Sequence, residues 1–446
     1  MKKDKIRIGV GTGFAGDRIE PAEILLEKGN LDYLVLECLA ERTIALAQKR
    51  KKANPSLGYD VLLEKRMQSL LPKLKNKATR IITNMGAANP QAGAEKILDI
   101  AKELGISIKV AVVTGDDVLS KISLDETVWE TGKALSDYGE ILSANAYIGA
   151  NALLSALQSD AHIIITGRVA DPSLFLAPMI HEFKWELNEL DNLAQGTVVG
   201  HLLECAGQLT GGYFADPGKK DVADLANLGF PYADVSSDGT AIFSKVENTG
   251  GQITLQTMKE QLLYEVLNPT AYITPDIIAD FSKVVFEEIN PGTIKVSGVT
   301  AVGKPDNLKV SIGYNAGFIG EGEISYAGEN ALARAELAGE IISERIRHLY
   351  TDFRVDLIGV NATHRKAFRQ IEPYEVRLRI AGKTPNASLA ALIGEEVEAL
   401  YTNGPAGGGG ARKNIVDVVG IVSTFIEENQ IEISTEKKEV RFNEII

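Results

Sequence analysis

The stretch IRIGVGTGFAGDR, residues 6–18, joins a short apolar run to three glycines in the spacing G-x-G-x-x-G. A second apolar run, DYLVLE at residues 32–37, ends in Glu37, about twenty residues beyond the last of these glycines. A buried strand, a glycine turn and a distant acidic residue, in this order, are typical of the βαβ unit that binds dinucleotides. The stretch therefore predicts the first strand and turn of an α/β domain, and it makes NAD a ligand to be tested.

Apolar runs of similar length recur over the first two hundred residues, at 80–86, 108–115 and 162–167. They are continuous rather than alternating, as are the strands of a parallel sheet that is covered on both faces. Helix-like patterns separate the runs, and two of these patterns end at Gly29 and Gly105. This alternation predicts an α/β fold with a doubly wound, mostly parallel sheet.

The second half of the chain has a different rhythm. Residues 213–255 are rich in loops, and short alternating runs joined by glycine turns, typical of antiparallel strands, follow from residue 283. Strong helix patterns at 329–350 and 388–401 separate further strand patterns. We therefore expect an α/β domain over residues 1–280 and a smaller α+β domain over residues 281–446.

Composition limits the class of partner. The chain has 446 residues, of which 45% are hydrophobic and 24% charged, and its formal net charge is −13. That charge argues against a nucleic acid or an anionic membrane as partner, because both need a basic face. Cys38 and Cys205 are the only cysteines, and no apolar stretch reaches the roughly 18 residues of a membrane span. We expect a reducing, cytoplasmic setting.

Polar side chains follow each predicted strand, where ligands bind in an open parallel sheet. They are Asp17 and Arg18, Glu37 and Glu41, Asn84 and Asn89, Asp116 and Asp117, and Arg168 and Asp171. Taken singly, each of them fits an ordinary loop residue or a helix cap. Taken together, they predict one pocket of mixed charge at the carboxyl edge of the sheet.

The residue types in this pocket indicate roles. We expect general acid and base catalysis from four carboxylates, with one pKa raised by like-charged neighbours: Asp17, Glu37, Asp116 and Asp171. Arg18 and Arg168 are expected to hold a substrate carboxylate in a bidentate way, with Asn84 as a further substrate contact. Gly11 and Gly13 would let the substrate approach the backbone.

His201 and Glu204 lie three residues apart in a helical pattern, so both face the same side of the helix. Such a pair can ligate a metal, but two ligands do not make a site. We favour a polar helix face against the rim of the pocket and predict no metal.

The run NGPAGGGGARK, residues 403–413, is the strongest anomaly of composition. Successive backbone N–H groups in such a loop can form an anion nest, here from Gly407, Gly408 and Gly409 beside Arg412. The alternative is a flexible hinge, since four consecutive glycines cost much entropy to order.

Several motifs together resemble the acyclic terpene utilisation family, whose members are named for bacterial growth on citronellol and geraniol. These motifs are GFAGDRIEPA, LDYLVLECLAERTIALAQ, TNMGAANP, VVTGDDV, ANAYIGA, ITGRVADPSLFLAP and GHLLECAGQLTGGYF, and the resemblance runs from about residue 6 to about residue 425. It implies a place in the catabolism of branched acyl-CoA thioesters and related acids. Many members carry a further small C-terminal domain or act with it as a separate chain, so the resemblance also implies a small partner subunit here.

The preferred function is a lyase or hydratase that acts on a carboxylated branched acyl substrate, with the CoA moiety of a thioester as one form of that substrate. In this hypothesis Asp116 or Glu37 abstracts a proton, and the loop at 404–410 stabilises an enolate or binds a phosphate. The alternatives are an NAD(P)-dependent oxidoreductase and a non-catalytic subunit of a multi-protein complex. We expect a small-molecule substrate, a homo-oligomer and no resident cofactor.

The residues after the glycine turn weaken the NAD hypothesis. Asp17 and Glu20 place negative charge where the start of a helix would attract a pyrophosphate. Pro21 indicates that the helix begins after the glycine loop rather than inside it. We therefore interpret the turn as one that presents Asp17 and Arg18 to a pocket shared with Glu37.

Overall fold

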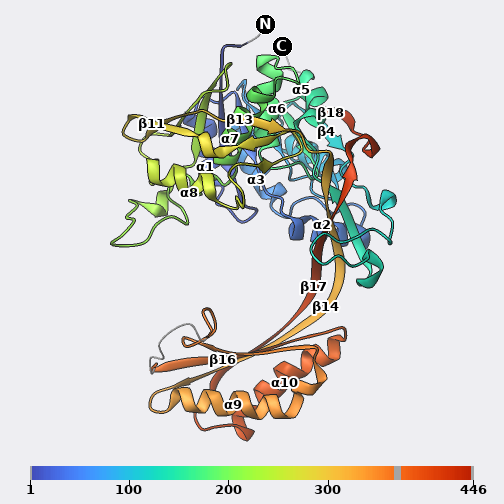
Figure 1. Ribbon diagram of the computed structural model, residues 1–446, viewed down its shortest axis with the longest axis vertical. Helices are drawn as coiled ribbons and strands as arrows, with labels where there is room; N and C mark the ends of the chain where they lie inside the picture. The colour runs from blue at the N-terminus through green and yellow to red at the C-terminus, as the bar shows by residue number, and fades with distance from the viewer. Residues whose placement is uncertain (1–2, 366–372, 443–446) are drawn as a thin grey trace. The chain divides into compact units, whose positions relative to one another are not determined.

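The computed structural model describes residues 3–365 and 373–442. The chain forms two compact units (Figure 1). The first consists of Met1–Asp137, Leu142–Gly313 and Ile421–Ile446, and the second of Tyr138–Ile141 and Tyr314–Gly420. The chain passes between the units along two long strands, β14 (Asn307–Ala327) and β17 (Gly409–Glu427). This division lies at Gly313, whereas the sequence places it near residue 280.

The described part of the first unit contains a ten-stranded sheet in the order β11-β12-β8-β7-β1-β2-β3-β6-β4-β18. Its parallel strands are β1 (Lys5–Thr12), β2 (Tyr33–Leu36), β3 (Arg80–Thr83), β6 (Ile163–Thr166) and β4 (Ile108–Thr114). The antiparallel strands are β7 (Pro231–Ser236), β8 (Ala241–Lys245), β11 (Val285–Asn290), β12 (Thr293–Ser297) and β18 (Ser434–Val440). The prediction of a mostly parallel sheet is thus corrected to a mixed one.

Burial explains which strands the sequence revealed. Every residue of β2 and β6 is buried, so their sequences YLVL and IIIT are continuous apolar runs. By contrast, β7 alternates between buried and half-buried residues and lies in a segment rich in glycine and aspartate turns. That weaker pattern indicates a loop-rich segment, whereas the structure forms a strand there.

The helices of the first unit pack in two groups. In one group α1 contacts α3, and α3 contacts α4; in the other α5 contacts α6, and α6 contacts α7. Their bounds are α1 Glu20–Lys28, α2 Glu41–Ala53, α3 Leu63–Leu74, α4 Pro90–Glu103, α5 Leu154–Gln158, α6 Ser173–Phe183, α7 Leu190–Glu204 and α8 Leu255–Leu263. A small sheet consists of β9 (Tyr272–Ile273), β10 (Ile278–Asp280) and β13 (Thr300–Gly303). The strand β5 (Ile141–Ala146) is separate from this sheet and pairs with β14.

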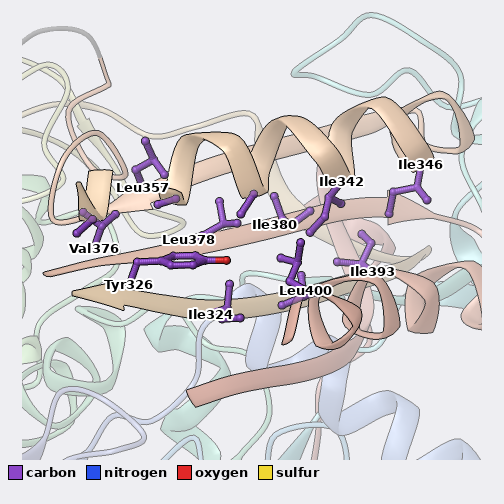
Figure 2. Packing of buried hydrophobic residues seen from close by; sticks show 14 of the residues in the cluster. Ile324, Tyr326, Ile342, Ile346, Leu357, Val376, Leu378, Ile380, Ile393 and Leu400 are labelled. Atoms are coloured by element: carbon purple, nitrogen blue, oxygen red, sulfur yellow. The ribbon is translucent and has the colours of Figure 1, made fainter. Parts of the chain in front are cut away.

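The second unit has its own core between a sheet and two helices (Figure 2). The strand order is β15-β16-β14-β17, with β15 at Asp352–Ile358 and β16 at Glu375–Thr384. Alternate residues of β16, such as Leu378 and Ile380, meet α9 (Ala331–Ile346) and α10 (Ala387–Asn403). The buried positions of α9 recur every three or four residues, which is the spacing of one helix face. A search of the described residues for a helix long and apolar enough to cross a membrane finds none.

Candidate functional site

A pocket of about 540 Å³ opens at the carboxyl ends of β1, β2 and β6 in the first unit. We call it the central pocket. Its position is where open α/β sheets bind their ligands, and its size suits a small molecule. The walls come from residues 13–15, 37–41, 168, 170–172, 204–205 and 208, together with Thr43, Tyr147, 264–265, 272–275, Pro305, 307–309 and Phe425.

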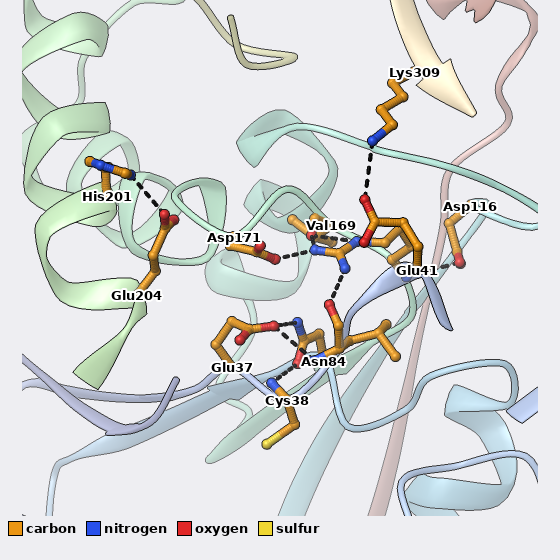
Figure 3. A network of polar contacts seen from close by, with 12 residues as sticks. Glu37, Cys38, Glu41, Asn84, Asp116, Val169, Asp171, His201, Glu204 and Lys309 are labelled. Atoms are coloured by element: carbon orange, nitrogen blue, oxygen red, sulfur yellow. Dashed lines mark hydrogen bonds and ion pairs between the residues drawn. The ribbon is translucent and has the colours of Figure 1, made fainter. Parts of the chain in front are cut away.

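Glu37 directly follows β2, and its carboxylate is held by Asn84, which directly follows β3 (Figure 3). Its Oε1 accepts hydrogen bonds from the Leu39 N–H at 2.8 Å and from Asn84 Nδ2 at 3.0 Å. Asn84 in turn accepts from the Cys38 N–H at 2.8 Å. Glu37 is only 7% exposed, and burial together with the charge of Asp171 raises its pKa well above the usual value. Glu37 therefore keeps its proton to a higher pH than an ordinary glutamate does.

Arg168 follows β6 and is buried, with most of its guanidinium already engaged. It donates to the carbonyls of Leu39 and Val169 and to the carboxylate of Asp171. The guanidinium carbon also lies 4.4 Å from the centre of the Tyr147 ring, a cation–π contact. Arg168 thus joins the segments after β2 and β6 and keeps Asp171 at the pocket wall.

Glu41 and Lys309 form a second ion pair at the wall, with Lys309 Nζ 3.1 Å from Glu41 Oε1. Burial raises the pKa of Glu41, but hydrogen bonds from Tyr147 and its own N–H, with the charge of Lys309, outweigh burial and bring that pKa to about 2. Glu41 is therefore ionised at any physiological pH. Lys309 remains 44% exposed in its side chain and is the pocket's accessible cation.

His201 and Glu204 form a hydrogen-bonded pair on the last turns of α7, with His201 Nδ1 2.8 Å from Glu204 Oε1 (Figure 3). His201 Nε2 lies 3.1 Å from the carbonyl of Leu262, which can only accept, so Nε2 carries a hydrogen. One further proton therefore lies between His201 Nδ1 and Glu204. Burial raises the pKa of Glu204 to about 7 although His201 opposes that shift. Glu204 Oε2 is buried and has no hydrogen-bond partner within the described residues.

A family model described as "Acyclic terpene utilisation family protein AtuA" matches residues 6–436 of the chain. The chain belongs to the acyclic terpene utilisation family. Searches of the curated proteins and of the solved structures found no match. The family assignment thus agrees with the motifs of the sequence.

Four predicted site residues of this family member line the central pocket, namely Gly13, Glu37, Arg168 and Asp171. Asn84 lies behind Glu37 and positions it. Asp116 is buried behind Arg168, where its Oδ2 accepts from the Arg168 N–H at 2.9 Å and from Asn145 Nδ2 at 2.8 Å. Asp116 therefore lines no part of the central pocket, and the catalytic role expected of it stays a prediction.

Asp17 and Arg18 do not share a pocket with Glu37. The Asp17 carboxylate folds back on the glycine turn and accepts from the N–H groups of Gly13 at 2.8 Å and Phe14 at 3.1 Å. Arg18 donates to the carbonyl of Ala226 and is not part of the wall. Asp17 was predicted to face the substrate, but a carboxylate beside unsatisfied N–H groups caps them instead.

The predicted glycines are used mainly for packing. A side chain on Gly11 would meet Leu36 and Ala22 within 2.8 Å, so this glycine lets α1 approach β1. Gly407, Gly408, Gly409 and Arg412 belong to the second unit and line no part of the central pocket. Gly409 and Arg412 already lie in β17, and Arg334 donates to the carbonyl of Ala406 in the turn before it.

The sequence missed several residues of the pocket. Tyr147 and Lys309 lie in segments where no predicted strand ends, and Glu204 was assigned to a helix face at the rim. The H-x-x-E spacing was the available signal for Glu204. In residues 3–365 and 373–442 no group of three His, Cys, Asp or Glu side chains is placed to hold a metal ion.

Proposed function

We propose that this protein is an enzyme of the hydratase or lyase type, with Glu37 and Glu204 as its general acid and base. The observation that carries the proposal is the pair of buried carboxyls in one pocket whose pKa values are both raised, that of Glu204 to about 7. Catalytic acids and bases are most effective when their pKa lies near the working pH. Pairs of carboxyl groups whose pKa values are shifted from the ordinary ones are a common sign of such sites.

Addition of water to a double bond needs one group that takes a proton from water and one that gives a proton to carbon. In the ionised form, Glu204 Oε2 can accept the first proton, because the bond to His201 occupies only Oε1. Glu37, whose Oε1 is held by Leu39 and Asn84, supplies the second. The reverse sequence eliminates water. Lys309 at the wall can stabilise negative charge on a substrate carbonyl oxygen.

An acyl substrate fits this arrangement. The cation that would contact it is Lys309, not Arg18 or Arg168 as the sequence predicts. Arg168 is tied to two carbonyls and Asp171, and Arg18 lies outside the wall. Lys309 is therefore the side chain that would meet a carboxylate or thioester group. A CoA moiety remains a proposal about the form of the substrate.

The oxidoreductase alternative loses its main support at the glycine turn. Pyrophosphate binding would use the free N–H groups of that turn and the positive end of the next helix. Here the N–H groups of Gly13 and Phe14 donate to Asp17, and the first turn of α1 carries Glu20 and Glu23. The acid–base function is the better match to these contacts.

The test is proton exchange and hydration in D2O, followed by NMR with short branched unsaturated and 3-hydroxy acids, each as free acid and as CoA thioester. We expect the wild-type protein to incorporate solvent deuterium or interconvert one such pair. Glu37→Gln and Glu204→Gln should each lower the rate by about 10²- to 10⁴-fold.

The matched control is Glu103→Gln, an exposed glutamate at the end of α4. It should keep the wild-type rate. Full activity in both pocket variants would refute the acid–base assignment. Binding of these acids without exchange or turnover would favour the non-catalytic subunit instead.

A further inference from the structure

A cavity of about 390 Å³ opens at the amino ends of β4 and β6 in the first unit. Its described lining residues include Ile108, the first residue of β4, and His162, which directly precedes β6. The central pocket lies at the carboxyl end of β6, so the two cavities lie at opposite ends of this strand. We call this space the amino-edge cavity. The acid–base chemistry proposed above uses none of its residues.

The polar side chains that line the amino-edge cavity can all donate hydrogen bonds. They are Lys75, Asn76, Lys77, Ser107 and His162. None of the described lining residues is Asp or Glu, although the chain as a whole has 60 acidic and 47 basic side chains. The cavity thus reverses the charge balance of the protein around it, and its lining suits an anion.

Two lysines that follow α3 supply the positive charge. Lys75 makes no ion pair or side-chain hydrogen bond within the described residues, and Lys77 Nζ makes only a long contact of 3.4 Å with a backbone carbonyl. Cations after a helix often satisfy its last carbonyls. Here backbone N–H groups do so, since Lys75 donates to the Leu71 carbonyl at 3.2 Å and Lys77 to that of Leu74 at 3.0 Å. Both ammonium groups therefore remain available to a ligand.

His162 adds a neutral donor beside the lysines. Its Nδ1 accepts from the Lys109 N–H at 3.0 Å, so Nε2 carries the ring hydrogen. This Nε2–H has no partner among the residues that the structure describes. Burial and the charges of Lys109 and Arg80 lower the pKa of His162, which keeps the ring neutral and shows that this edge of the sheet has a positive potential.

The floor of the amino-edge cavity is apolar. It consists of the buried side chains Leu71, Leu74, Ile106 and Ile108. At the wall, the Phe442 N–H donates to Ser107 Oγ at 2.9 Å, which leaves the hydroxyl hydrogen of Ser107 to donate elsewhere. Donors above an apolar floor fit a ligand with an anionic group on an apolar body.

We propose that the amino-edge cavity binds a phosphorylated small molecule with an aromatic or similarly apolar body. Lys75 and Lys77 meet the phosphate, and the Nε2–H of His162 donates to one of its oxygens. A phosphate monoester has three terminal oxygens and a charge near −2, so it uses several convergent donors better than a carboxylate does. The body of the ligand lies against the apolar floor. This site is independent of the chemistry proposed for the central pocket.

The experiment is titration calorimetry of the full chain with phenyl phosphate, inorganic phosphate and benzoate. Phenyl phosphate should bind at one site, and at least about fivefold more tightly than either of the other two. Lys75→Gln and Lys77→Gln should each weaken it about five- to tenfold. Ile106→Ala should weaken phenyl phosphate about threefold but leave inorganic phosphate unchanged. The controls are Lys133→Gln, an exposed lysine outside the lining, and Lys309→Gln in the central pocket, and both should keep the wild-type affinity.

Three results would overturn the proposal. The first is no saturable binding of phenyl phosphate up to about 10 mM, and the second is benzoate binding as tightly as phenyl phosphate. The third is a loss in Lys309→Gln or Lys133→Gln that equals the loss in Lys75→Gln, because the ligand would then bind elsewhere or only to charge in general. None of these measurements requires turnover at Glu37 and Glu204, so failure here and failure of the proposed function are distinguishable.

Discussion

Glu204 shows how one neighbour sets the behaviour of a catalytic candidate. Burial raises its pKa to about 7, and His201 counters that rise by its charge and its hydrogen bond. Replacing His201 with glutamine keeps a hydrogen-bonding group but removes the charge, so the pKa of Glu204 should rise further. If Glu204 acts as base, the pH at which kcat/KM reaches half its maximum should move up by about one unit. The measurement is the pH profile of deuterium exchange, and an unchanged profile would argue that Glu204 is not the base.

The raised pKa of Asp116 predicts an effect on stability rather than on activity. Burial raises its pKa from 3.8 to about 6, with the Arg168 N–H and Asn145 opposing the shift. Between these values the folded protein keeps a proton that the unfolded chain has released, so stability falls as the pH rises through this window and is level above it. The shift of about two pKa units corresponds to about 3 kcal/mol.

Asp116→Asn removes the titration while keeping the shape of the side chain. The variant can still accept from the Arg168 N–H and Asn145 Nδ2 through its amide oxygen, as Asp116 does through Oδ2. Its free energy of unfolding by urea should lack the decline of about 3 kcal/mol between pH 4 and pH 6. Equal pH slopes for the two proteins would show that Asp116 does not carry this proton.

The site could be predicted from the sequence where its residues follow strands. Glu37 and Asp171 were found because the carboxyl ends of β2 and β6 necessarily meet at one edge of the sheet. Glu204 and Lys309 come from α7 and β14, whose approach to that edge depends on packing between distant parts of the chain. Asp17 has the right position, but local N–H groups capture its carboxylate, and a pattern of residue types does not show which way a side chain turns.

At the scale of elements, the contact between the first turn and α7 is the tightest part of the site. A side chain on Gly13 would lie 2.2 Å from the carbonyl oxygen of Glu204 and 2.6 Å from Cys205 Cα. Gly13→Ala should therefore force the turn and α7 apart. We expect a loss of about 1–3 kcal/mol in the free energy of unfolding together with loss of activity, since Glu204 moves with its backbone.

Gly303→Ala is the matched comparison, because nothing lies within 4 Å of the added methyl group and the backbone has no positive φ. It should leave activity unchanged and alter stability by less than about 1 kcal/mol. Both values come from chemical denaturation and the deuterium-exchange assay. Similar behaviour of the two variants would mean that the turn is free to shift without consequence.

Among the elements, the buried parallel strands were predicted, whereas β7 and β8 lie in residues 213–255, which the sequence indicates to be rich in loops. The strand β14 is divided in the sequence by glycines, which join two of the short alternating runs that follow residue 283, namely 307–315 and 320–328. Two of these glycines serve the close approach of α10, since a side chain on Gly320 or Gly322 would meet Ala390 or Val397. A glycine that admits a helix looks the same in the sequence as a glycine that ends a strand.

At the scale of the whole molecule, the second unit is inserted into the chain of the first. The chain leaves the first unit briefly for Tyr138–Ile141 and again from Tyr314 to Gly420, and each unit has its own buried core. The residues of the proposed site all belong to the first unit. The glycine-rich turn of residues 404–410 belongs to the second unit. The sequence-based hypothesis placed this turn in one site with Glu37 and Asp116, whereas the fold places it in a different unit from them.

Because each unit buries its own core, we expect them to lose structure in separate transitions. Leu378 in β16 and Leu202 in α7 are both fully buried, one in each unit. Leu378→Ala and Leu202→Ala should each cost about 2–5 kcal/mol, but each in the unit that contains it. Hydrogen exchange followed by mass spectrometry can assign the loss to peptides. Leu378→Ala should speed exchange in the second unit and spare residues 3–137, whereas Leu202→Ala should do the reverse. If either variant accelerated exchange equally in both, the two units would be one cooperative body, and a change in the second unit would then reach Glu37 and Glu204.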